Sequence, residues 1–285
     1  MTARHPDLAV VSFNAVPMYN PTAKYDRLGP MGIANRRLWC VRHGYPLYTD
    51  ASVPADMPAC WAKFAALERA LARHEWVLWA DSDALVLNLQ HDAARFCIPG
   101  VDLVSQSMDA VAHRAGVDPA RLLAHQPVNT GVFLLRAAHW TRDLLARAAA
   151  KRQYAGAPGT APDAIWDGIG DQEALIAALA ECPGRIAQVD SLQCHPALYR
   201  PGVDLFVHFW GNHAAHRIAP AQQEAVLGAW ETAVARGGPV PADLATFHWC
   251  CIQQRAPGMA YDRGGPARFL YGEDAHGHPC CTLSS

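Results

Sequence analysis

The sequence predicts an α/β protein built on an open, mainly parallel β-sheet. Short apolar, β-branched runs alternate along the chain with amphipathic segments of helical period, which is the order that produces a sheet flanked by helices. Residues 76–80, Trp-Val-Leu-Trp-Ala, contain no polar side chain, as expected of a strand covered on both faces. Ligands of such sheets bind beyond the carboxyl ends of the strands. Polar residues that follow the strands are therefore the first candidates for a functional site.

The N-terminal elements begin with a strand over residues 8–13, which leads into a polar loop that we expect to continue through Pro30. The pattern then predicts a helix over 32–43. Two basic residues in its last turn and Gly44 directly after it are typical of a helix C-terminus. Residues 45–49 are predicted as the next strand.

A second helix of about four turns is predicted to begin at Pro58. Its expected inward stripe has helical spacing and consists of Trp61, Phe64, Ala65, Leu67, Glu68 and Leu71. The strand over 76–80 follows, and after the acidic segment 81–83 comes a short apolar run over 84–87.

The remaining elements of the sheet domain are less sharply bounded. Strands are predicted over 101–105 and 128–135, a β-like run over 203–207, helices over 137–150, 171–181 and 221–236, and a loop over 156–162. From residue 237 the pattern loses its periodicity. We therefore expect one α/β domain over 1–236 and a Cys/His-containing extension of irregular structure over 237–285, packed on it.

Composition excludes several classes of protein. The 285 residues include 24 Lys+Arg and 26 Asp+Glu, with 51% hydrophobic residues. This is the profile of a folded chain rather than a disordered one. A net charge of −2 without a basic stripe argues against binding to nucleic acid, because phosphate neutralisation needs a basic surface.

Targeting signals are also absent from the pattern. The longest apolar runs fall far short of the roughly 20 residues that span a bilayer, and we see no signal-peptide pattern at the N-terminus. The nine cysteines are odd in number and scattered. We therefore expect reduced thiols and a cytoplasmic location, or peripheral association with a membrane.

The most informative residues are Asp81 and Asp83, which flank Ser82 where the apolar strand stops. Two residues apart in an extended segment, the carboxylates would face the same way. They would then repel each other unless a cation lay between them, and a divalent ion that also binds a diphosphate removes that cost. The alternative interpretation is an Asx turn with both carboxylates solvated.

A second group of residues, around His208, follows the β-like run over 203–207. A neutral imidazole there could complete a metal site, and Gly211 would let the backbone approach a phosphate. Two carboxylates with one imidazole suit Mn²⁺ somewhat better than Mg²⁺, which prefers oxygen ligands. A histidine satisfied within the core is the alternative.

Taken together, these segments resemble the galactosyl- and xylosyltransferase family that includes yeast α-galactosyl- and mannosyltransferases and plant xyloglucan xylosyltransferases. The resemblance runs from about residue 8 to residue 213, in the family's order. The matching segments are Asn35, Trp39-Cys40, His43-Gly44-Tyr45, Trp61-Ala62-Lys63, residues 76–84, residues 129–136 with Trp140, residues 170–176, and His208-Phe209-Trp210-Gly211.

The resemblance implies a GT-A fold and retaining transfer of a hexose or pentose from a nucleotide sugar, expected to be a UDP-sugar, to a hydroxyl acceptor such as a glycan. It also implies roles for individual residues. Mn²⁺, with Mg²⁺ as the alternative, would be held by Asp81, Asp83 and His208. Ser82 and Gly211 would lie on the donor side, Asp171 and Gln172 at the sugar face near the anomeric carbon, and Asn129, Thr130 and Gly131 on the acceptor side.

The chain departs from the family's pattern at two positions. Gly170 stands where an acidic residue usually precedes the Asp-Gln pair, and His213 stands where a Lys usually follows the His-x-x-Gly segment. An imidazole stabilises a leaving diphosphate only when it is protonated. We therefore expect activity to fall above the pKa of His213 if this residue replaces the lysine on the donor side.

Position along the chain suggests further contacts. Ser12 and Asn14, at the end of the first strand, are placed to touch the base or ribose, unless they only fill the loop. Lys63 either reaches a phosphate or lies on a solvated helix face. Trp210 is the candidate for stacking on a sugar, whereas Trp76 and Trp79 are expected in the core.

Asp171 is also expected to cap the helix that it begins. This capping role is compatible with a catalytic one, in which the carboxylate would stabilise positive charge at the sugar ring or, less favourably, act as a nucleophile.

Two other functions are consistent with the residues. A phosphohydrolase of the haloacid-dehalogenase kind also has Asp-x-Asp at a strand end, although its nucleophile normally follows the first strand. A protein that binds sugar nucleotides or glycans without catalysis is the other alternative.

The extension contains a further group of potential metal ligands, namely His248, Cys250, Cys251, His276, His278, Cys280 and Cys281. They could bind zinc, but the adjacent-Cys spacing is not that of usual structural sites. We expect free thiols in a segment that covers the acceptor cleft.

Overall fold

The fold was analysed in a computed structural model of the 285-residue chain. It describes residues 6–13, 24–49, 59–86, 89–125, 127–154, 170–194, 198, 200, 202–208, 260–262, 268–273 and 279–284. The loop expected over 156–162 and the helix expected over 221–236 lie outside these ranges.

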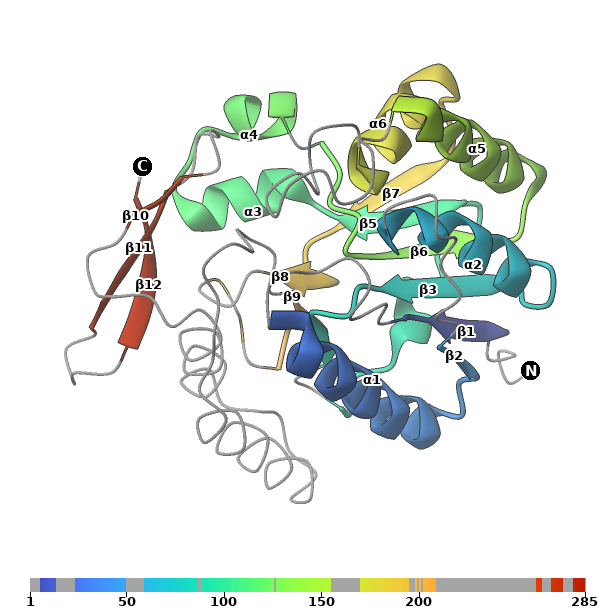
Figure 1. The fold of residues 1–285 in the computed structure, drawn as a ribbon, viewed down its shortest axis with the longest axis horizontal. Coiled ribbons are helices and arrows are strands. Elements are labelled where there is room, and N and C mark those ends of the chain that lie inside the picture. Colours follow the sequence, from blue (N-terminus) through green and yellow to red (C-terminus); the bar gives the residue numbers. More distant parts are fainter. Residues whose placement is uncertain are drawn as a thin grey trace.

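A six-stranded mixed sheet forms the centre of the molecule, in the order β2-β1-β3-β6-β5-β7 (Figure 1). The strands are β1 (Leu8–Val11), β2 (Leu47–Tyr48), β3 (Trp76–Ala80), β5 (Leu103–Gln106), β6 (Val132–Arg136) and β7 (Ile186–Val189). The pairs β1–β2, β1–β3 and β5–β7 are parallel, and β6 runs antiparallel to both of its neighbours. The expected mainly parallel sheet is confirmed, with β6 as its reversed strand.

Helices cover both faces of this sheet (Figure 1). They are α1 (Lys24–His43), α2 (Ala62–Leu71), α3 (Met108–Ala115), α4 (Pro119–His125), α5 (His139–Ala150) and α6 (Asp171–Glu181), with 3₁₀ turns at Ala59–Trp61, Ala93–Phe96 and Lys151–Tyr154. The helix predicted over 171–181 is confirmed at both ends, and the helix expected from Pro58 corresponds to the first 3₁₀ turn and α2.

Strand β3 shows how the two cores are divided. Its residues Val77 and Trp79 pack into the cluster formed with α2, α5 and α6. Trp76, Leu78 and Ala80 point to the other face and pack with residues of α1 and of a smaller sheet. All five are buried, so the prediction of a strand covered on both faces is confirmed, as is the core placement of both tryptophans.

The smaller sheet brings distant segments to the end of β3. It contains β4 (Ala84–Val86), β8 (Gln193–Cys194) and β9 (Phe206–His208), in the order β4-β9-β8. Strand β4 is antiparallel to β9, with Ala84 opposite His208, and β8 is parallel to β9. The segment after β3 is thereby joined to a strand more than a hundred residues later.

The C-terminal segment contains regular structure that we did not expect. Strands β10 (Ala260–Asp262), β11 (Arg268–Glu273) and β12 (Pro279–Ser284) form an antiparallel sheet. The expectation of irregular structure rested on missing periodicity, but antiparallel neighbours pair through the backbone and do not require it. The division at residue 237 and the choice between zinc and free thiols stay predictions.

The largest differences from the expected boundaries are at the starts of α1 and β6. Helix α1 begins at Lys24 and runs through Pro30, whereas the polar composition of this segment had led us to expect a loop through Pro30. Its C-terminus is as predicted, with Gly44 at φ 74°. Strand β6 begins at Val132 rather than at residue 128.

The inward face of α2 also differs from the predicted stripe. Ala65 and Glu68 are exposed, and Lys63 and Ala66 are buried in their place. The apolar pattern could not distinguish these positions, because what buries Lys63 is a set of polar partners from other elements.

Two further properties can be stated for the described residues. Among the described residues no helix is both long and apolar enough to span a membrane. The cysteines with described side chains are all free thiols, at positions 40, 60, 97, 182 and 194.

Candidate metal centre

The acidic pair lies in a turn directly after β3. The backbone N–H of Asp81 donates to the carbonyl of Gly131 at 2.7 Å, and the Asp81 carbonyl accepts from the N–H of Ala84 at 3.0 Å. The segment is therefore a turn, whereas we had assumed that it is extended. It is the turn, and the pairing of β4 that follows it, that brings the carboxylates of Asp81 and Asp83 to one place.

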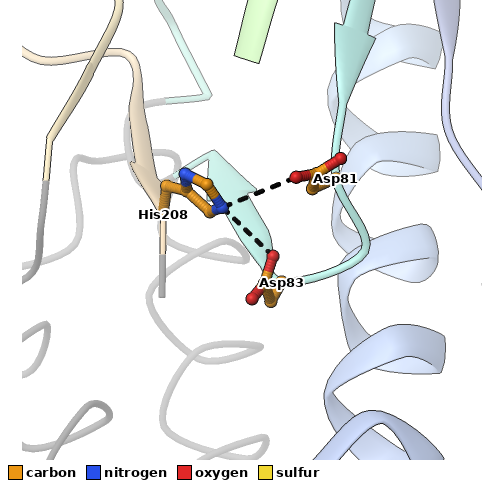
Figure 2. Close-up of side chains that lie close together, drawn as sticks. All are labelled: Asp81, Asp83 and His208. Atoms are coloured by element: carbon orange, nitrogen blue, oxygen red, sulfur yellow. Dashed lines mark ion pairs between the residues drawn. The ribbon is translucent and has the colours of Figure 1, made fainter. Parts of the chain in front are cut away.

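His208 completes the group from the end of β9 (Figure 2). Its Nε2 lies 3.3 Å from Oδ1 of Asp83 and 3.7 Å from Oδ2 of Asp81. One ligand atom of each residue lies within 4.8 Å of the other two. The predicted convergence of the three side chains is confirmed.

The two separations measured from Nε2 of His208 fit a divalent cation. Ligands of an octahedral ion with bonds of about 2.1 Å lie about 3.0 Å apart when adjacent and about 4.2 Å apart across the ion. The two separations from Nε2 fall within that interval. A donor set of two carboxylates and one imidazole suits Mn²⁺, and Mg²⁺ less well.

Gly131 makes room for the imidazole. A Cβ added at residue 131 would overlap Cε1, Nδ1 and Nε2 of His208. Gly131 packs against the His208 ring while its carbonyl accepts from the backbone N–H of Asp81, and its place on the acceptor side stays a prediction. A side chain here would push out a metal ligand, so glycine is required by close approach rather than by its backbone angles.

The environment of Asp81 disfavours an isolated charge. Burial raises the pKa of Asp81, and the nearby carboxylates of Asp171 and Asp83 raise it further, while Lys63 and His208 lower it. The indole N–H of Trp79 also donates to Oδ1 of Asp81 at 2.6 Å. Because the net direction is upward, a cation at this position would relieve a real electrostatic cost.

Lys63 lies in the interior and connects two carboxylates. Its ammonium forms ion pairs with Asp171 and, at 3.1 Å, with Asp81, and it donates to the carbonyl of Thr130 at 3.0 Å. Although burial lowers the pKa of Lys63, the two carboxylates raise it above its ordinary value. The alternative of a solvated helix face is wrong, and the phosphate contact stays a prediction.

Asp171 does not cap its helix. Gly170 is the N-cap residue of α6 and no side chain accepts a capping hydrogen bond there. The Asp171 carboxylate binds Lys63 instead. Next to it, Oε1 of Gln172 accepts from the backbone N–H of Thr130 at 3.1 Å. The first turn of α6 is thereby tied to the loop before β6, near the acidic turn.

Helix α1 holds the segment that follows the acidic turn. The Asn35 amide donates to the carbonyl of Val86 at 2.9 Å and accepts from its N–H at 2.7 Å. The fully buried Arg36 donates to the carbonyl of Ala84. Burial lowers the pKa of Arg36 to about 10, against the raising effect of Asp83. Strand β4, and with it Asp83, is fixed by these contacts.

The other predicted residues have varied surroundings. Ser12 is fully buried, and its Oγ has no hydrogen-bond partner among the described residues. Its contact with a nucleotide stays a prediction, as does that of the half-buried Ser82. The buried Asn129 and Thr130 contact other site residues. Asn14, Trp210, Gly211 and His213 lie outside the described residues.

Sequence reasoning missed three contributors. Trp79 was assigned to the core alone, although its spacing of two from Asp81 places both on one side of the chain. Arg36 is adjacent to Asn35 and carries no signal of its own. Gln193 follows no motif, and only the fold reveals its contact with His208 at 3.0 Å.

Comparison with known sequences places this geometry in a family. Residues 10–156 match the galactosyl transferase GMA12/MNN10 family. The chain belongs to this family. The matched region includes Asp81, Asp83 and Gly131, while Asp171 and His208 lie beyond it. Because the chain belongs to a galactosyl transferase family, the alternative of a phosphohydrolase of the haloacid-dehalogenase kind is rejected.

Curated relatives extend well beyond the matched region. Xyloglucan 6-xylosyltransferase 1 of Arabidopsis thaliana is 29% identical over 133 residues, which are 45% of this chain and 27% of the relative. Across the strongest matches the shared region is 23–31% of the relative's length. The chain therefore corresponds to about a third of these relatives or less.

A solved structure supports the fold. A glycosyltransferase involved in the glycosylation of the major capsid of PBCV-1 superposes with a TM-score of 0.53 and 18% identity, over 78% of this chain and 99% of that protein. The expected GT-A fold is confirmed by this likeness.

Proposed function

We propose that this protein is a metal-dependent glycosyltransferase that moves a hexose or pentose from a nucleotide sugar, in the first place a UDP-sugar, to a hydroxyl group of an acceptor such as a glycan. The observation that carries the proposal is the convergence of Asp81, Asp83 and His208 at the carboxyl end of β3, in a member of a galactosyl transferase family. The curated relatives named as xylosyltransferases support a pentose as an alternative to galactose.

Each residue of the centre has a defined task in this proposal. Asp81, Asp83 and His208 would bind Mn²⁺, with Mg²⁺ as the alternative. The bound ion would supply Lewis-acid stabilisation of the departing diphosphate. Asn35 and Arg36 hold the backbone of β4 directly after the acidic turn, and this would preorganise the carboxylates for an ion. Such preorganisation reduces the reorganisation that binding and reaction require.

The pair Asp171 and Gln172 would face the sugar. Lys63 ties Asp171 to Asp81, so the sugar side and the metal side are joined by one ammonium group. A carboxylate held there can stabilise positive charge that develops at the anomeric carbon. We propose transfer with retention of configuration on the basis of the family resemblance.

The test is turnover of sugar nucleotides. UDP- and GDP-sugars are screened for release of nucleoside diphosphate with Mn²⁺, with Mg²⁺ and with EDTA, and the product anomer is determined by NMR. We expect Mn²⁺-dependent release from a UDP-sugar. Asp81→Ala and Asp83→Ala are expected to abolish it while the melting temperature stays close to that of the wild type.

The same assay distinguishes the proposal from binding without catalysis. Gly170 occupies a position that is usually acidic in the family, and His213 one that is usually lysine. Binding of UDP together with Mn²⁺, but without turnover of any sugar nucleotide, would support a binding protein. A turnover rate that stays constant from acidic to alkaline pH would exclude a protonated His213 from the reaction.

A further inference from the structure

Gln193, on β8, is completely buried beside the metal centre. Its amide nitrogen lies 2.9 Å from the carbonyl oxygen of Val132 and 3.3 Å from that of Asn129. Backbone carbonyls only accept hydrogen bonds. The end of the Gln193 side chain that faces them must therefore be the NH₂ group.

A third contact gives the same orientation. The Gln193 nitrogen lies 3.2 Å from Oδ1 of Asn129, and that oxygen already accepts from the backbone N–H of Gly131 at 2.9 Å. A backbone N–H only donates, so the Asn129 atom in question is an oxygen. With its nitrogen assigned in this way, Gln193 must present its oxygen in the opposite direction.

That oxygen faces His208. Oε1 of Gln193 lies 3.0 Å from Nδ1 of the imidazole. An amide oxygen only accepts, so Nδ1 must carry the proton of this hydrogen bond. In a neutral imidazole the other nitrogen then has a free lone pair. The other nitrogen is Nε2, the atom that faces Asp81 and Asp83.

We infer that Gln193 is a positioning residue that holds His208 in the Nδ1–H tautomer and aims the lone pair of Nε2 at a divalent cation between the two carboxylates. The inference rests on the metal site of the proposed function. Metal-binding histidines commonly donate their second N–H to a fixed acceptor, which sets the ring orientation and raises the basicity of the ligand.

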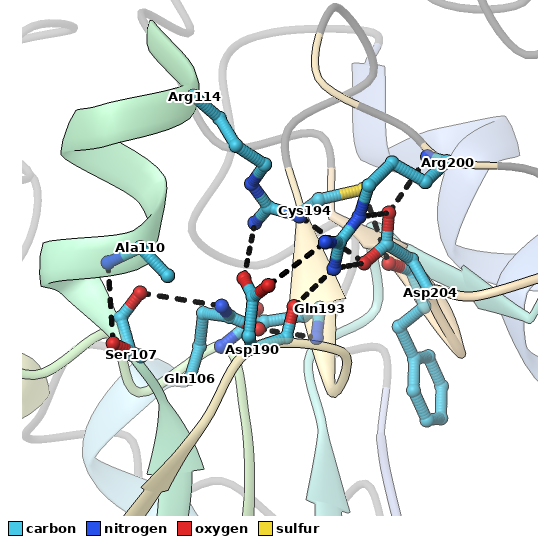
Figure 3. A network of polar contacts seen from close by, with 10 residues as sticks. Gln106, Ser107, Ala110, Arg114, Asp190, Gln193, Cys194, Arg200 and Asp204 are labelled. Carbon is cyan, nitrogen blue, oxygen red and sulfur yellow. Dashed lines mark hydrogen bonds and ion pairs between the residues drawn. The ribbon is translucent and has the colours of Figure 1, made fainter.

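Gln193 is itself held in place (Figure 3). Its backbone N–H donates to Oε1 of the buried Gln106 at 2.9 Å, and the Gln106 amide donates to the carbonyl of Ser107 at 3.2 Å. The start of β9 is held by Asp204, which pairs with Arg200 at 2.7 Å and with Arg114 at 3.3 Å. The acceptor and the strand that carries His208 are thus each anchored by polar contacts, and the two strands also pair with each other.

The first measurement reads the tautomer of the wild type directly. Long-range ¹H–¹⁵N correlation spectra of the metal-free wild type at alkaline pH show which ring nitrogen of His208 is protonated, and a His208→Gln sample identifies its signals. We expect a proton on Nδ1 and none on Nε2. A proton on Nε2 would overturn the inference, whatever the protein's activity.

The second measurement compares two buried glutamines. Gln193→Met is expected to change the tautomer of His208 and to weaken Mn²⁺ binding, followed by electron paramagnetic resonance, by about 10- to 100-fold. Of the contacts that Gln193 makes, Gln106→Met removes only the hydrogen bond to its backbone N–H and keeps the Gln193 side chain, so its effect on the tautomer and on the Mn²⁺ affinity is expected to be smaller than that of Gln193→Met. A folded Gln193→Met protein with the wild-type tautomer and affinity would contradict the inference.

The outcomes separate this inference from the proposed function. A wild type that binds no Mn²⁺ would defeat the metal-dependent glycosyltransferase, while the tautomer would still decide the role of Gln193. A wild type that binds Mn²⁺ with an Nε2–H ring in its metal-free form would defeat only the role of Gln193.

Discussion

Two aspartates lie at opposite strand ends of the same sheet, one where β3 ends and one where β5 begins. We call these two sides of the sheet its edges, and the environments of the two carboxylates are opposite. Asp102, just before β5, pairs with Arg136 at 2.7 Å and with Arg185 at 2.9 Å. Although burial raises the pKa of Asp102, the hydrogen bonds and charges of the two arginines lower it overall. Asp81, just after β3, has a raised pKa because of burial, and the nearby carboxylates of Asp171 and Asp83 add to the rise.

The difference separates a structural carboxylate from a candidate metal ligand. The Asp102 carboxylate pairs with two guanidinium groups. It thereby connects the residue before β5 to the end of β6 and to the residue before β7. At the other edge, Lys63 is shared between Asp81 and Asp171, and the carboxylates of Asp81 and Asp83 converge on one imidazole. A pair of carboxylates this close is stabilised by an added cation. We therefore expect changes at one edge to affect metal binding and changes at the other to affect stability.

The largest expected effect is that of Asp83→Asn at the metal edge. Loss of a charged ligand should weaken Mn²⁺ binding by more than about 100-fold, since removal of an outer-shell partner alone costs about 10- to 100-fold. Isothermal titration calorimetry measures the affinity and thermal unfolding serves as the control. A variant with wild-type affinity would remove Asp83 from the site.

Gly131→Ala should act at the same edge by displacing the imidazole. The added Cβ overlaps the His208 ring, so either the ring or the loop before β6 must move. We expect Mn²⁺ affinity to fall by about 10- to 100-fold, with the secondary structure preserved in circular dichroism. An unchanged affinity would mean that His208 can bind the ion from another position.

Asp102→Asn should lower the stability and leave the Mn²⁺ affinity unchanged, the reverse of the effect expected at the metal site. Removing the charge leaves Arg136 and Arg185 without their anionic partner and lowers the free energy of unfolding by about 1–2 kcal/mol. Urea denaturation measures the loss, and Mn²⁺ affinity should stay at the wild-type value. A marked loss of Mn²⁺ binding in a folded variant would show that the two edges are coupled.

The smallest expected effect is the pH dependence of the difference in unfolding free energy between the wild type and Asp102→Asn. The folded-state pKa of Asp102 lies below the ordinary 3.8, so its stabilising contribution is complete above pH 3.8 and is lost as the pH falls through the folded-state value. The stability curves of the wild type and Asp102→Asn should therefore converge in acid. Curves that stay parallel to the lowest pH would contradict the ion pairing.

Much of the fold and the metal ligands could be predicted from local patterns. The wholly apolar run of β3 identified a strand covered on both faces, and polar residues directly after strands marked the edge where Asp81, Asp83 and His208 meet. Helix α3 could also have been predicted, since Ser107 caps it and Gly116 ends it in the left-handed conformation.

The rest depends on partners that are distant in the sequence. Lys63 looks like a solvated helix residue until α6 brings Asp171, 108 positions away, to its ammonium. Asp171 likewise looks like a helix cap as long as its distant partner Lys63 is unknown. Gln193 has no local pattern, and its orientation follows only from the backbone carbonyls of Asn129 and Val132 and from Oδ1 of Asn129.

The existence and place of the ion can be observed directly by anomalous diffraction from crystals grown with Mn²⁺, recorded on both sides of the manganese absorption edge. We predict one strong peak per chain, within bonding distance of a carboxylate oxygen of Asp81, a carboxylate oxygen of Asp83 and Nε2 of His208. A map without a peak among these atoms, or with manganese bound only elsewhere on the chain, would contradict the metal centre and the function proposed from it.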